Sequence, residues 1–511
     1  MPNAERIAPV DTTWLRMDVP GNPMVNNGVL IFEGPLKLDR LEETLSERLL
    51  AIPRFRQRAE MRSGDYWWCE DPTLDVRRHI KRVRLPGKGD RAELENYISE
   101  LVSEPLDKTR PLWQIRIVEH YEGGAAVIVR AHHAIADGIA AMGVLLSLMD
   151  NGDGRQQSTI GAFKAGAHRR PWPSVPGAET LRQALELASD LLQEATQLAS
   201  SPVKTVRAGA GIAGELAYLL LMPQDSPTRF KGKPGGDKRV AWTDPVALPE
   251  VRAVSKALGC SINDMLLASV AGALGDYLRD KGDPTEGVEI RAVVPVNMRT
   301  ADEAGQLGNR FGVVGVELPV GVEDPRERLQ EVRRRMNELK ESFEPPVTLA
   351  LYAALGFAPK IVQDRLFKLL TSRATAVMTN VAGPQRPLYL AGAPLKQIII
   401  WVPQTGDIGM GVSILSFNGM VQFGLMTDAA LVPDPEAIIA HFKPNFEQLL
   451  YFVLMEPWEN EGAEKAGKTE QEPRLAAAPR LKRRAKSTPS SPSPKTASGA
   501  TRRKLPHQRK A

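Results

Sequence analysis

The heptapeptide at positions 132–138, His-His-Ala-Ile-Ala-Asp-Gly, constrains this chain more than any other stretch. It follows the apolar run 125–129, which is typical of a buried strand, and precedes the apolar segment 139–149, which has helical length. The pattern HHxxxDG is therefore expected at a strand-to-helix turn. Because side chains alternate along an extended chain, His132 and His133 should point in opposite directions, so that one can face a cavity while the other packs.

The chemistry of these residue types favours proton transfer. A neutral imidazole can accept a proton from a hydroxyl group near neutral pH, and Gly138 permits backbone angles that other residues avoid. The alternatives are a packed pair of core histidines and half of a metal site. The chain has only 7 histidines and contains neither HExxH nor CxxC, which does not favour a metal. The fixed spacing to Asp137 and Gly138 favours a general base.

HHxxxDG is the signature of the acyl-CoA-dependent acyltransferase superfamily, and further segments resemble one branch of it in the expected order. Over about residues 7–450 the chain resembles the bacterial wax ester synthase/diacylglycerol acyltransferases. The stretches that carry the resemblance are Pro9-Val10-Asp11, Trp14-Leu15, Asn22-Pro23-Met24, Pro53-Arg54-Phe55-Arg56-Gln57, Leu106-Asp107, Pro111-Leu112-Trp113, Ser261-Ile262-Asn263-Asp264, Asn297-Met298-Arg299, Gly308-Asn309 and Thr379-Asn380-Val381-Ala382-Gly383-Pro384.

The resemblance implies an α/β fold with two chloramphenicol-acetyltransferase-like lobes and an active-site tunnel between them. We expect an N-terminal lobe with the motif at residues 1–175 and a helical linker at 176–237. A C-terminal lobe at 238–458 and a disordered basic tail at 459–511 should follow. The periodicity of the sequence alone predicts only a mixed α/β protein.

The resemblance also implies roles for the residues of the motif. His133 would be the general base, His132 would orient the turn, and Asp137 would be structural, paired with an arginine. Arg299 is the first candidate for that partner and Arg291 the second.

Four more residues are candidates for contact with the substrate. Asn263 could donate a hydrogen bond near the acceptor or the oxyanion, or it could cap a helix, since Asn favours that position. Asp264 stands in the same Asn-Asp motif. Asn380 and Gly383 are expected to shape the tunnel through tight backbone turns.

The reaction implied by the resemblance needs a long-chain acyl-CoA as co-substrate and no metal or resident cofactor. The acceptor would be diacylglycerol or a long-chain fatty alcohol. Such acceptors predict a cytoplasmic enzyme that associates peripherally with the inner membrane or with lipid inclusions. The alternatives are a condensation or polyketide-associated acyltransferase acting on carrier-protein thioesters, and a non-catalytic protein that binds lipid droplets.

The net charge of +5 comes from the C-terminal end. Residues 459–511 contain 14 basic and 5 acidic residues, a net of +9, which leaves −4 for the rest of the chain. This segment is rich in Ser, Pro, Thr and Ala and should be disordered. It could attract anionic lipid headgroups or be merely solvated; nucleic-acid binding is disfavoured because aromatic stacking residues are lacking.

Other local patterns predict individual elements. Asp39 with Glu42 and Asp90 with Glu93 resemble capping boxes at helix starts. Residues 181–198 form an amphipathic helical pattern that could pack on the protein or lie at a membrane interface. Asn-Gly at 418–419 predicts a hairpin between strands 412–417 and 420–426, and residues 398–402 read as a strand of the second half.

No run of about eighteen apolar residues or secretory signal is recognised, and the 2 cysteines indicate a reducing compartment. Cys260 is expected to be a buried small side chain rather than a nucleophile.

Overall fold

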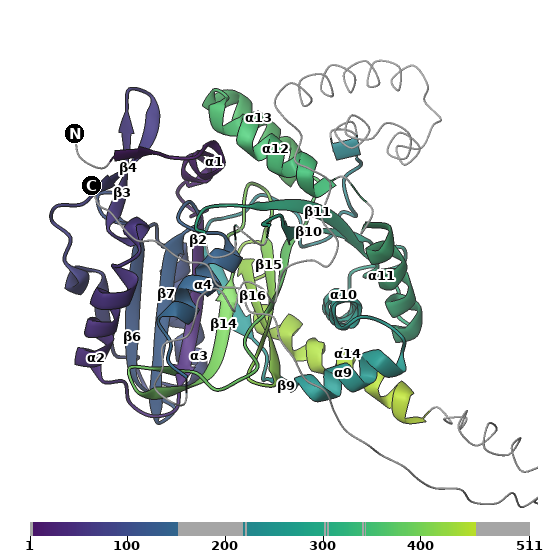
Figure 1. Ribbon diagram of the computed structural model, residues 1–511. Coiled ribbons are helices and arrows are strands. Elements are labelled where there is room, and N and C mark those ends of the chain that lie inside the picture. The colour runs from purple at the N-terminus through teal and green to yellow at the C-terminus, as the bar shows by residue number, and fades with distance from the viewer. Residues whose placement is uncertain are drawn as a thin grey trace, which may run out of the picture. The chain divides into compact units, whose positions relative to one another are not determined.

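The structure, a computed structural model, describes residues 4–151, 218–219, 222–300, 303, 306–339, 342 and 344–455 (Figure 1). All of them belong to one compact unit, residues 1–456. The predicted basic tail, residues 459–511, lies outside the described residues, as does the helix expected at 181–198. The domain boundaries therefore stay predictions, whereas the α/β fold class is confirmed.

Six strands form the first sheet, in the order β13-β14-β2-β7-β6-β5. Neighbouring strands are antiparallel except β5 and β6, which are parallel. In the order given, the strands span Tyr389–Leu390, Ala393–Trp401, Val25–Phe32, Gly124–His132, Trp113–Tyr121 and Ile80–Val83.

Both faces of this sheet are covered, which explains the apolar runs 29–32 of β2 and 125–129 of β7. Leu30 and Phe32 of β2 belong to the core cluster that contains helix α4 (Gly138–Ser147). The alternate residues Val29 and Ile31 belong to the cluster that contains helix α3 (Arg91–Ser103). The first turn of α3 has the predicted capping box, with Asp90 and Glu93 bonded reciprocally.

The second sheet has seven strands, in the order β11-β10-β12-β15-β16-β8, with β9 also paired to β16. In chain order β8 to β12 span Lys238–Trp242, Val246–Ala247, Ile290–Asn297, Phe311–Leu318 and Ala376–Ala382, and β15 and β16 span Met410–Phe417 and Met420–Asp428. The predicted β15–β16 hairpin is present, because Asn418 and Gly419 both adopt positive φ, 46° and 79°, as a type I′ turn requires.

Helices α9, α10, α11 and α14 share one core with the second sheet (Figure 1). They span Leu248–Ala257, Ile262–Asp280, Pro325–Leu339 and Pro435–Met455. Helices α12 (Glu344–Phe357) and α13 (Lys360–Thr371) lie elsewhere, beside the N-terminal helix α1 (Pro9–Met17) and strand β11.

A small antiparallel sheet, β1-β4-β3, completes the N-terminal half. Its strands span Ala4–Arg6, Asp65–Glu70 and Gln57–Arg62. Helix α2 (Leu38–Thr44) continues into a π-helical turn (Leu45–Leu49), and 3₁₀ turns span Pro53–Phe55 and Val76–Arg78.

One local prediction was wrong. The capping box at Asp39 and Glu42 is absent: α2 begins at Leu38, its N-cap is Lys37, and no side chain caps it. The strand expected at 398–402 is confirmed as β14, which lies in the first sheet between β13 and β2. An apolar strand pattern specifies burial and does not specify which sheet the strand joins.

Within the described residues, no single helix is long and apolar enough to cross a bilayer. Helices α9 and α10 together satisfy the length and composition test, but they meet at a bend of 97°.

Candidate active site

The motif lies where β7 ends and α4 begins, as the sequence predicts. Strand β7 ends at His132, and Asp137 is the N-cap residue of α4, where its Oδ1 accepts a hydrogen bond from Ala140 N at 2.9 Å. The backbone N–H groups of His132 and His133 donate to Leu112 O (2.9 Å) and Met24 O (2.8 Å). The turn is therefore held from both sides by neighbouring chain segments.

His132 is buried and lines neither of the two apolar cavities described below. Its Nδ1 accepts a hydrogen bond from Ala134 N at 3.0 Å, so the proton of the neutral ring must sit on Nε2, which lies 3.7 Å from Asp18 Oδ2. Burial alone would raise the pKa of Asp18, but the nearby His132 ring and Lys108, whose Nζ lies 2.8 Å from Asp18 Oδ2, outweigh it and lower that pKa far below its usual value. This arrangement agrees with an orienting role for His132.

His133 faces the opposite way and lines a cavity. Its ring stacks on Trp14, with centroids 4.2 Å apart, and lies 5.7 Å from the ring of Phe311. Burial, the largest effect, lowers the pKa of His133 to about 4. The imidazole is therefore neutral at pH 7 and keeps a lone pair available for a proton.

Asp137 and Arg299 form a buried ion pair. Arg299 Nη1 lies 2.5 Å from Asp137 Oδ2, and the two side chains are only 2% and 5% exposed. The same oxygen accepts a hydrogen bond from Arg310 N at 3.1 Å, and Arg299 Nη2 donates to Gly308 O at 2.8 Å. Both carboxylate oxygens of Asp137 therefore have donors, and Arg299 and Arg310 join the motif to the second half of the chain.

Arg291, the second candidate for this pairing, lies elsewhere. Its Nη2 is 2.9 Å from Glu317 Oε1, and its Nη1 donates to the carbonyls of Pro223 and Arg373. Arg291 therefore does not contact Asp137.

A second buried group supports the backbone of His133. Asn309 Nδ2 donates to His133 O at 2.9 Å and to Asp11 Oδ1 at 2.7 Å, and Asn309 N also donates to Asp11 Oδ1 at 3.1 Å. Burial raises the pKa of Asp11 to about 6, although the bonds from Asn309 oppose the shift. His133 Nδ1 and Asn309 Oδ1 are both buried without a hydrogen-bond partner among the described residues.

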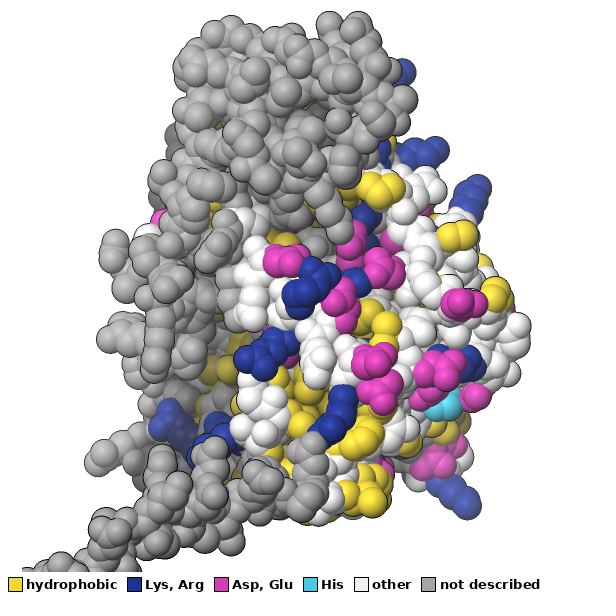
Figure 2. All heavy atoms as spheres, turned by 90° about the vertical axis from the view of Figure 1, so that its right-hand side faces the viewer, with side chains coloured by type: hydrophobic (Ala, Val, Ile, Leu, Met, Phe, Trp, Pro, Cys, Tyr) yellow, Lys and Arg dark blue, Asp and Glu magenta, His cyan; other side chains and the backbone are white. Residues whose placement is uncertain are grey.

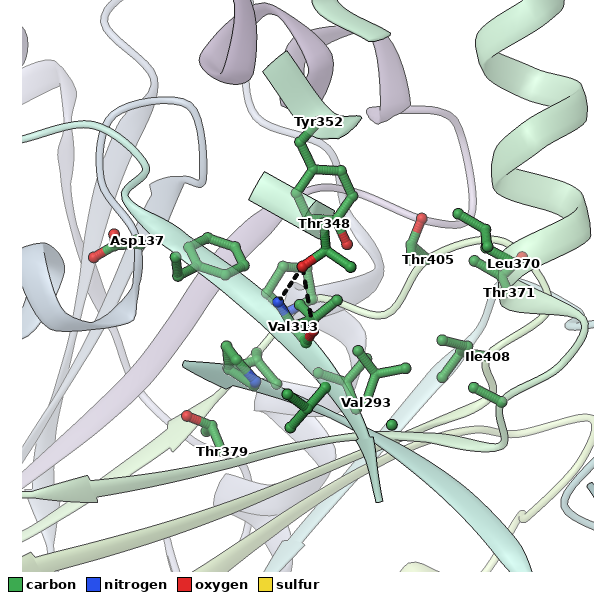
Figure 3. Close-up of a pocket in the computed structure, with 18 of the residues that line it drawn as sticks. Asp137, Val293, Val313, Thr348, Tyr352, Leu370, Thr371, Thr379, Thr405 and Ile408 are labelled. Atoms are coloured by element: carbon green, nitrogen blue, oxygen red, sulfur yellow. Dashed lines mark hydrogen bonds between the residues drawn. The ribbon is translucent and has the colours of Figure 1, made fainter. Parts of the chain in front are cut away.

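The cavity beside His133 is mostly apolar and is lined by both halves of the chain. Figure 3 shows side chains converging on it from β10 and β11 (Val293, Val313), from α12 (Thr348, Tyr352) and from the end of α13 (Leu370, Thr371). A second apolar cavity lies under α4, against the first sheet, and is lined by Ile115, Val129, Ala141, Met142 and Leu145 among others. The two cavities share Gly138 and Val402 in their walls.

Comparison with family models decides the relationship. The model described as "Wax ester synthase/diacylglycerol acyltransferase catalytic domain" matches residues 7–266, and the "WS/DGAT C-terminal domain" matches residues 307–450. The chain belongs to the wax ester synthase/diacylglycerol acyltransferase family. It is therefore an acyltransferase, as the motif predicts.

Curated relatives and solved structures agree with the family. The chain is 28% identical over 414 residues to "Probable diacyglycerol O-acyltransferase tgs1" of Mycobacterium tuberculosis, which covers 79% of this chain and 86% of the relative. It is 27% identical over 458 residues to tgs2 of the same species, covering 86% and 98%. The wax ester synthase/diacylglycerol acyltransferase of Marinobacter aquaeolei VT8 has the same fold, with a TM-score of 0.61 at 22% identity over 88% of this chain and all of that one.

The remaining candidates of this acyltransferase divide into two groups. Asn380 lines the main cavity, and its Nδ2 donates to Asn263 Oδ1 at 3.0 Å. The helix-cap alternative for Asn263 was wrong, because Ser261 is the N-cap of α10. Asp264 was predicted to contact substrate, but its buried carboxylate accepts from Ser261 N at 3.0 Å and completes a capping box. Its side chain stabilises the helix start.

The two glycines also differ. A Cβ on Gly383 would lie 2.4 Å from Ser416 O, so this glycine permits the close approach of β12 and β15 and does not line either cavity. A Cβ on Gly138 would meet nothing within 4 Å, and this glycine lies in the walls of both cavities.

Three residues of the site received no role in the sequence analysis: Asp11, Trp14 and Asn309. Each stands in a stretch that carries the family resemblance, which was the only available signal. Cys260 is not set up as a nucleophile, because burial raises the pKa of its thiol to about 11. Among the described residues, no three His, Cys, Asp or Glu side chains converge as a metal site would require.

Proposed function

We propose that this acyltransferase moves a long-chain acyl group from acyl-CoA to the free hydroxyl of diacylglycerol or of a long-chain fatty alcohol. The products would be triacylglycerol and a wax ester. The observation that carries the proposal is a neutral histidine, His133, in the wall of an apolar cavity. The names of the curated mycobacterial relatives favour diacylglycerol as the acceptor.

His133 would act as general base in a direct transfer. It accepts the hydroxyl proton while the acceptor oxygen attacks the thioester carbon, which gives a tetrahedral intermediate with a negatively charged oxygen. When the intermediate collapses, the carbon–sulfur bond breaks and the protonated His133 returns the proton to the thiolate of CoA. The ester and free CoA leave, and neither a covalent acyl-enzyme nor a metal is needed.

The surrounding residues would position this base. Asp137 and Arg299 hold the turn, and His132 orients it from the other side. Asn380, which lines the main cavity and is bonded to Asn263, is available for a bond to the acceptor, and so is Asn297, which lines the same cavity. Gly138 leaves open the space where the two cavities adjoin.

Two cavities suit a reaction between two aliphatic chains. The cavity under α4 and the cavity beside α12 both have mainly apolar walls, and an acyl chain and an acceptor chain both need such walls. Because diacylglycerol and fatty alcohols partition into lipid, we propose that the enzyme associates peripherally with a membrane or a lipid inclusion while it acts.

Purified protein incubated with palmitoyl-CoA and either dioleoylglycerol or hexadecanol tests the proposal. Free CoA is followed with a thiol reagent, and the neutral lipid is identified by chromatography. We expect acceptor-dependent product from the wild type and none from His133→Ala. The matched control is His441→Ala, which removes a histidine outside the site that is paired with Asp280. Folded wild type that transfers palmitate to neither alcohol would contradict the proposal, and so would a fully active His133→Ala.

A further inference from the structure

We propose that the corner formed by the end of α12 and the outer face of α13 is the surface through which this enzyme docks on phospholipid-covered lipid. The inference rests on the proposed function, since it names the surface from which a lipid acceptor would reach the cavity. We call this surface the α12–α13 corner and define it by Phe357, Ile361, Val362, Arg365 and Lys368.

Large apolar side chains are exposed together at this corner. Phe357, Ile361 and Val362 are 69%, 63% and 49% exposed, and they stand within six residues of one another along the chain. Val19, Met61 and Met420 are also exposed, but each stands alone on a different segment, whereas Tyr451, Leu454 and Met455 form a second exposed group at the end of α14. Isolated exposed apolar residues need no explanation, whereas a contiguous group indicates an interaction surface.

The charge around the corner is basic. Helix α13 contains Lys360, Arg365 and Lys368 and one acidic residue, Asp364, which pairs with Lys360 at 2.9 Å. Within the described ranges, Arg365 and Lys368 have no carboxylate at ion-pair distance. Apolar side chains bordered by unpaired basic residues suit the interface of a membrane that carries anionic headgroups.

Helix α11 shows the contrasting pattern of an ordinary solvated face. Arg334 and Arg335 are paired with Glu331 at 2.6 Å. Figure 2 shows the side of the molecule on which α11 lies, and acidic and basic side chains alternate there. Both α11 and α13 carry two more basic than acidic residues, so the α12–α13 corner differs from α11 in its exposed apolar side chains.

The opposite side of the same two helices lines the main cavity. Phe367 and Thr371, which lie one and two turns after the buried Gln363, face inward from α13, and Tyr352 faces inward from α12. Figure 3 shows Tyr352, Leu370 and Thr371 directed at the cavity. A lipid surface in contact with the corner would lie about 10 Å, one helix diameter, from that cavity. An acceptor drawn from that surface would have a short path to His133.

The corner is held firmly against α1. Arg16 Nη1 donates to Gly356 O at 3.1 Å and to Ala358 O at 2.8 Å, and Gln363 Nε2 donates to Thr13 O at 3.2 Å. A Cβ on Gly356 would lie 2.0 Å from Pro9 O, so the two helices are in close backbone contact. The exposed apolar side chains therefore belong to a built surface and not to a frayed helix end.

Flotation of full-length protein with vesicles tests the corner directly. The vesicles contain phosphatidylcholine and dioleoylglycerol, so that the basic tail has little anionic lipid to bind. We expect the partition coefficient of Phe357→Ser/Ile361→Ser/Val362→Ser to fall about tenfold or more below that of the wild type. The matched control Val19→Ser/Met61→Ser/Met420→Ser removes three exposed apolar side chains elsewhere and should bind as the wild type does.

Two further measurements complete the test. Adding phosphatidylglycerol should strengthen binding of the wild type, and Arg365→Gln/Lys368→Gln, with the tail unchanged, should lose about tenfold of that gain. Transfer to dioleoylglycerol in vesicles should fall with binding in the triple variant, while transfer to dioleoylglycerol in detergent micelles should stay at the wild-type rate.

Specific outcomes would overturn the proposal. Unchanged flotation of the Phe357 triple variant would do so, as would an equal loss in the matched control. A change from dimer to monomer in the triple variant with unchanged flotation would assign the corner to a contact between two copies of the chain. Wild type without transfer in micelles would contradict the proposed function alone, because flotation still reports on the surface.

Discussion

Removal of the guanidinium from the buried pair between Asp137 and Arg299 should destabilise the protein strongly. In Arg299→Gln the carboxylate keeps two backbone donors, Ala140 N and Arg310 N, but loses the guanidinium at 2.5 Å. The side chains are 2% and 5% exposed, so water cannot replace the lost partner. Leaving one charge of a buried pair uncompensated costs about 3–5 kcal/mol, and we expect the free energy of unfolding to fall by that amount.

A substitution of Asp137 and a double variant distinguish the contribution of the ion pair from that of the helix cap. Asp137→Asn keeps a side-chain oxygen that can accept from Ala140 N, and Asn caps helices about as well as Asp. The substitution therefore preserves the cap but removes the carboxylate that pairs with Arg299. The double variant removes both charges. It should be more stable than the sum of the single losses predicts, by about 0.5–3 kcal/mol, as contacting residues show in double-mutant cycles.

Urea unfolding followed by tryptophan fluorescence measures these differences. The matched control is Arg82→Gln, which breaks an ion pair with Glu119 of 2.7 Å in which Arg82 is 64% exposed. An exposed pair contributes about 1 kcal/mol or less. If Arg299→Gln cost no more than Arg82→Gln, the pair would not hold the turn. A fully stable but inactive Asp137→Asn would instead give the carboxylate a direct chemical role.

Four further outcomes are expected from the same site. Because burial lowers the pKa of His133 to about 4, kcat/KM for acyl transfer should remain nearly constant from pH 8 to pH 6.5. An imidazole of ordinary pKa would have lost half of its base form at pH 6.5, so a kcat/KM that halves between these two pH values would contradict the lowered pKa of His133. Asn309→Ala should lower kcat about tenfold or more with little change in KM, measured by initial rates, because the backbone of His133 loses a donor. Gly138→Val should favour octanoyl-CoA over palmitoyl-CoA in a competition assay, because its side chain would enter the open space shared by the cavities. Cys260→Ala should retain wild-type activity, since burial raises the pKa of that thiol to about 11 and keeps it protonated.

Local chemistry made the motif predictable. Three local signals predicted the position of the β7–α4 turn: the apolar run 125–129, the helix-capping residue Asp137 and Gly138. Each of them acts within a few residues of the chain. The capping box at Asp90 was predictable for the same reason. The similar pattern at Asp39 failed because α2 begins at Leu38, which places Asp39 inside the first turn with no capping bond.

The long-range parts of the site could not be derived from local pattern. Asn309 and Asp11 are 298 residues apart in the chain, and no periodicity connects them. The two candidate arginines are separated by topology: Arg291 lies within β10, whereas Arg299 follows the end of that strand and can reach the turn. Only the family resemblance ranked Arg299 first.

The position of β14, a strand of the second half that lies in the first sheet, explains why the site needs both halves of the chain. This strand follows the second-sheet strand β12 in sequence, but it pairs with β2, whose other neighbour β7 leads into the motif. Val402, directly after β14, lies in the walls of both cavities. Two residues of the second half contact the motif. Arg299, which follows β10, pairs with Asp137, and Asn309, which precedes β11, donates to the backbone carbonyl of His133. A base on the first sheet is thus held by residues of the second half, and separating the halves would remove the cavity together with the contacts that position His133.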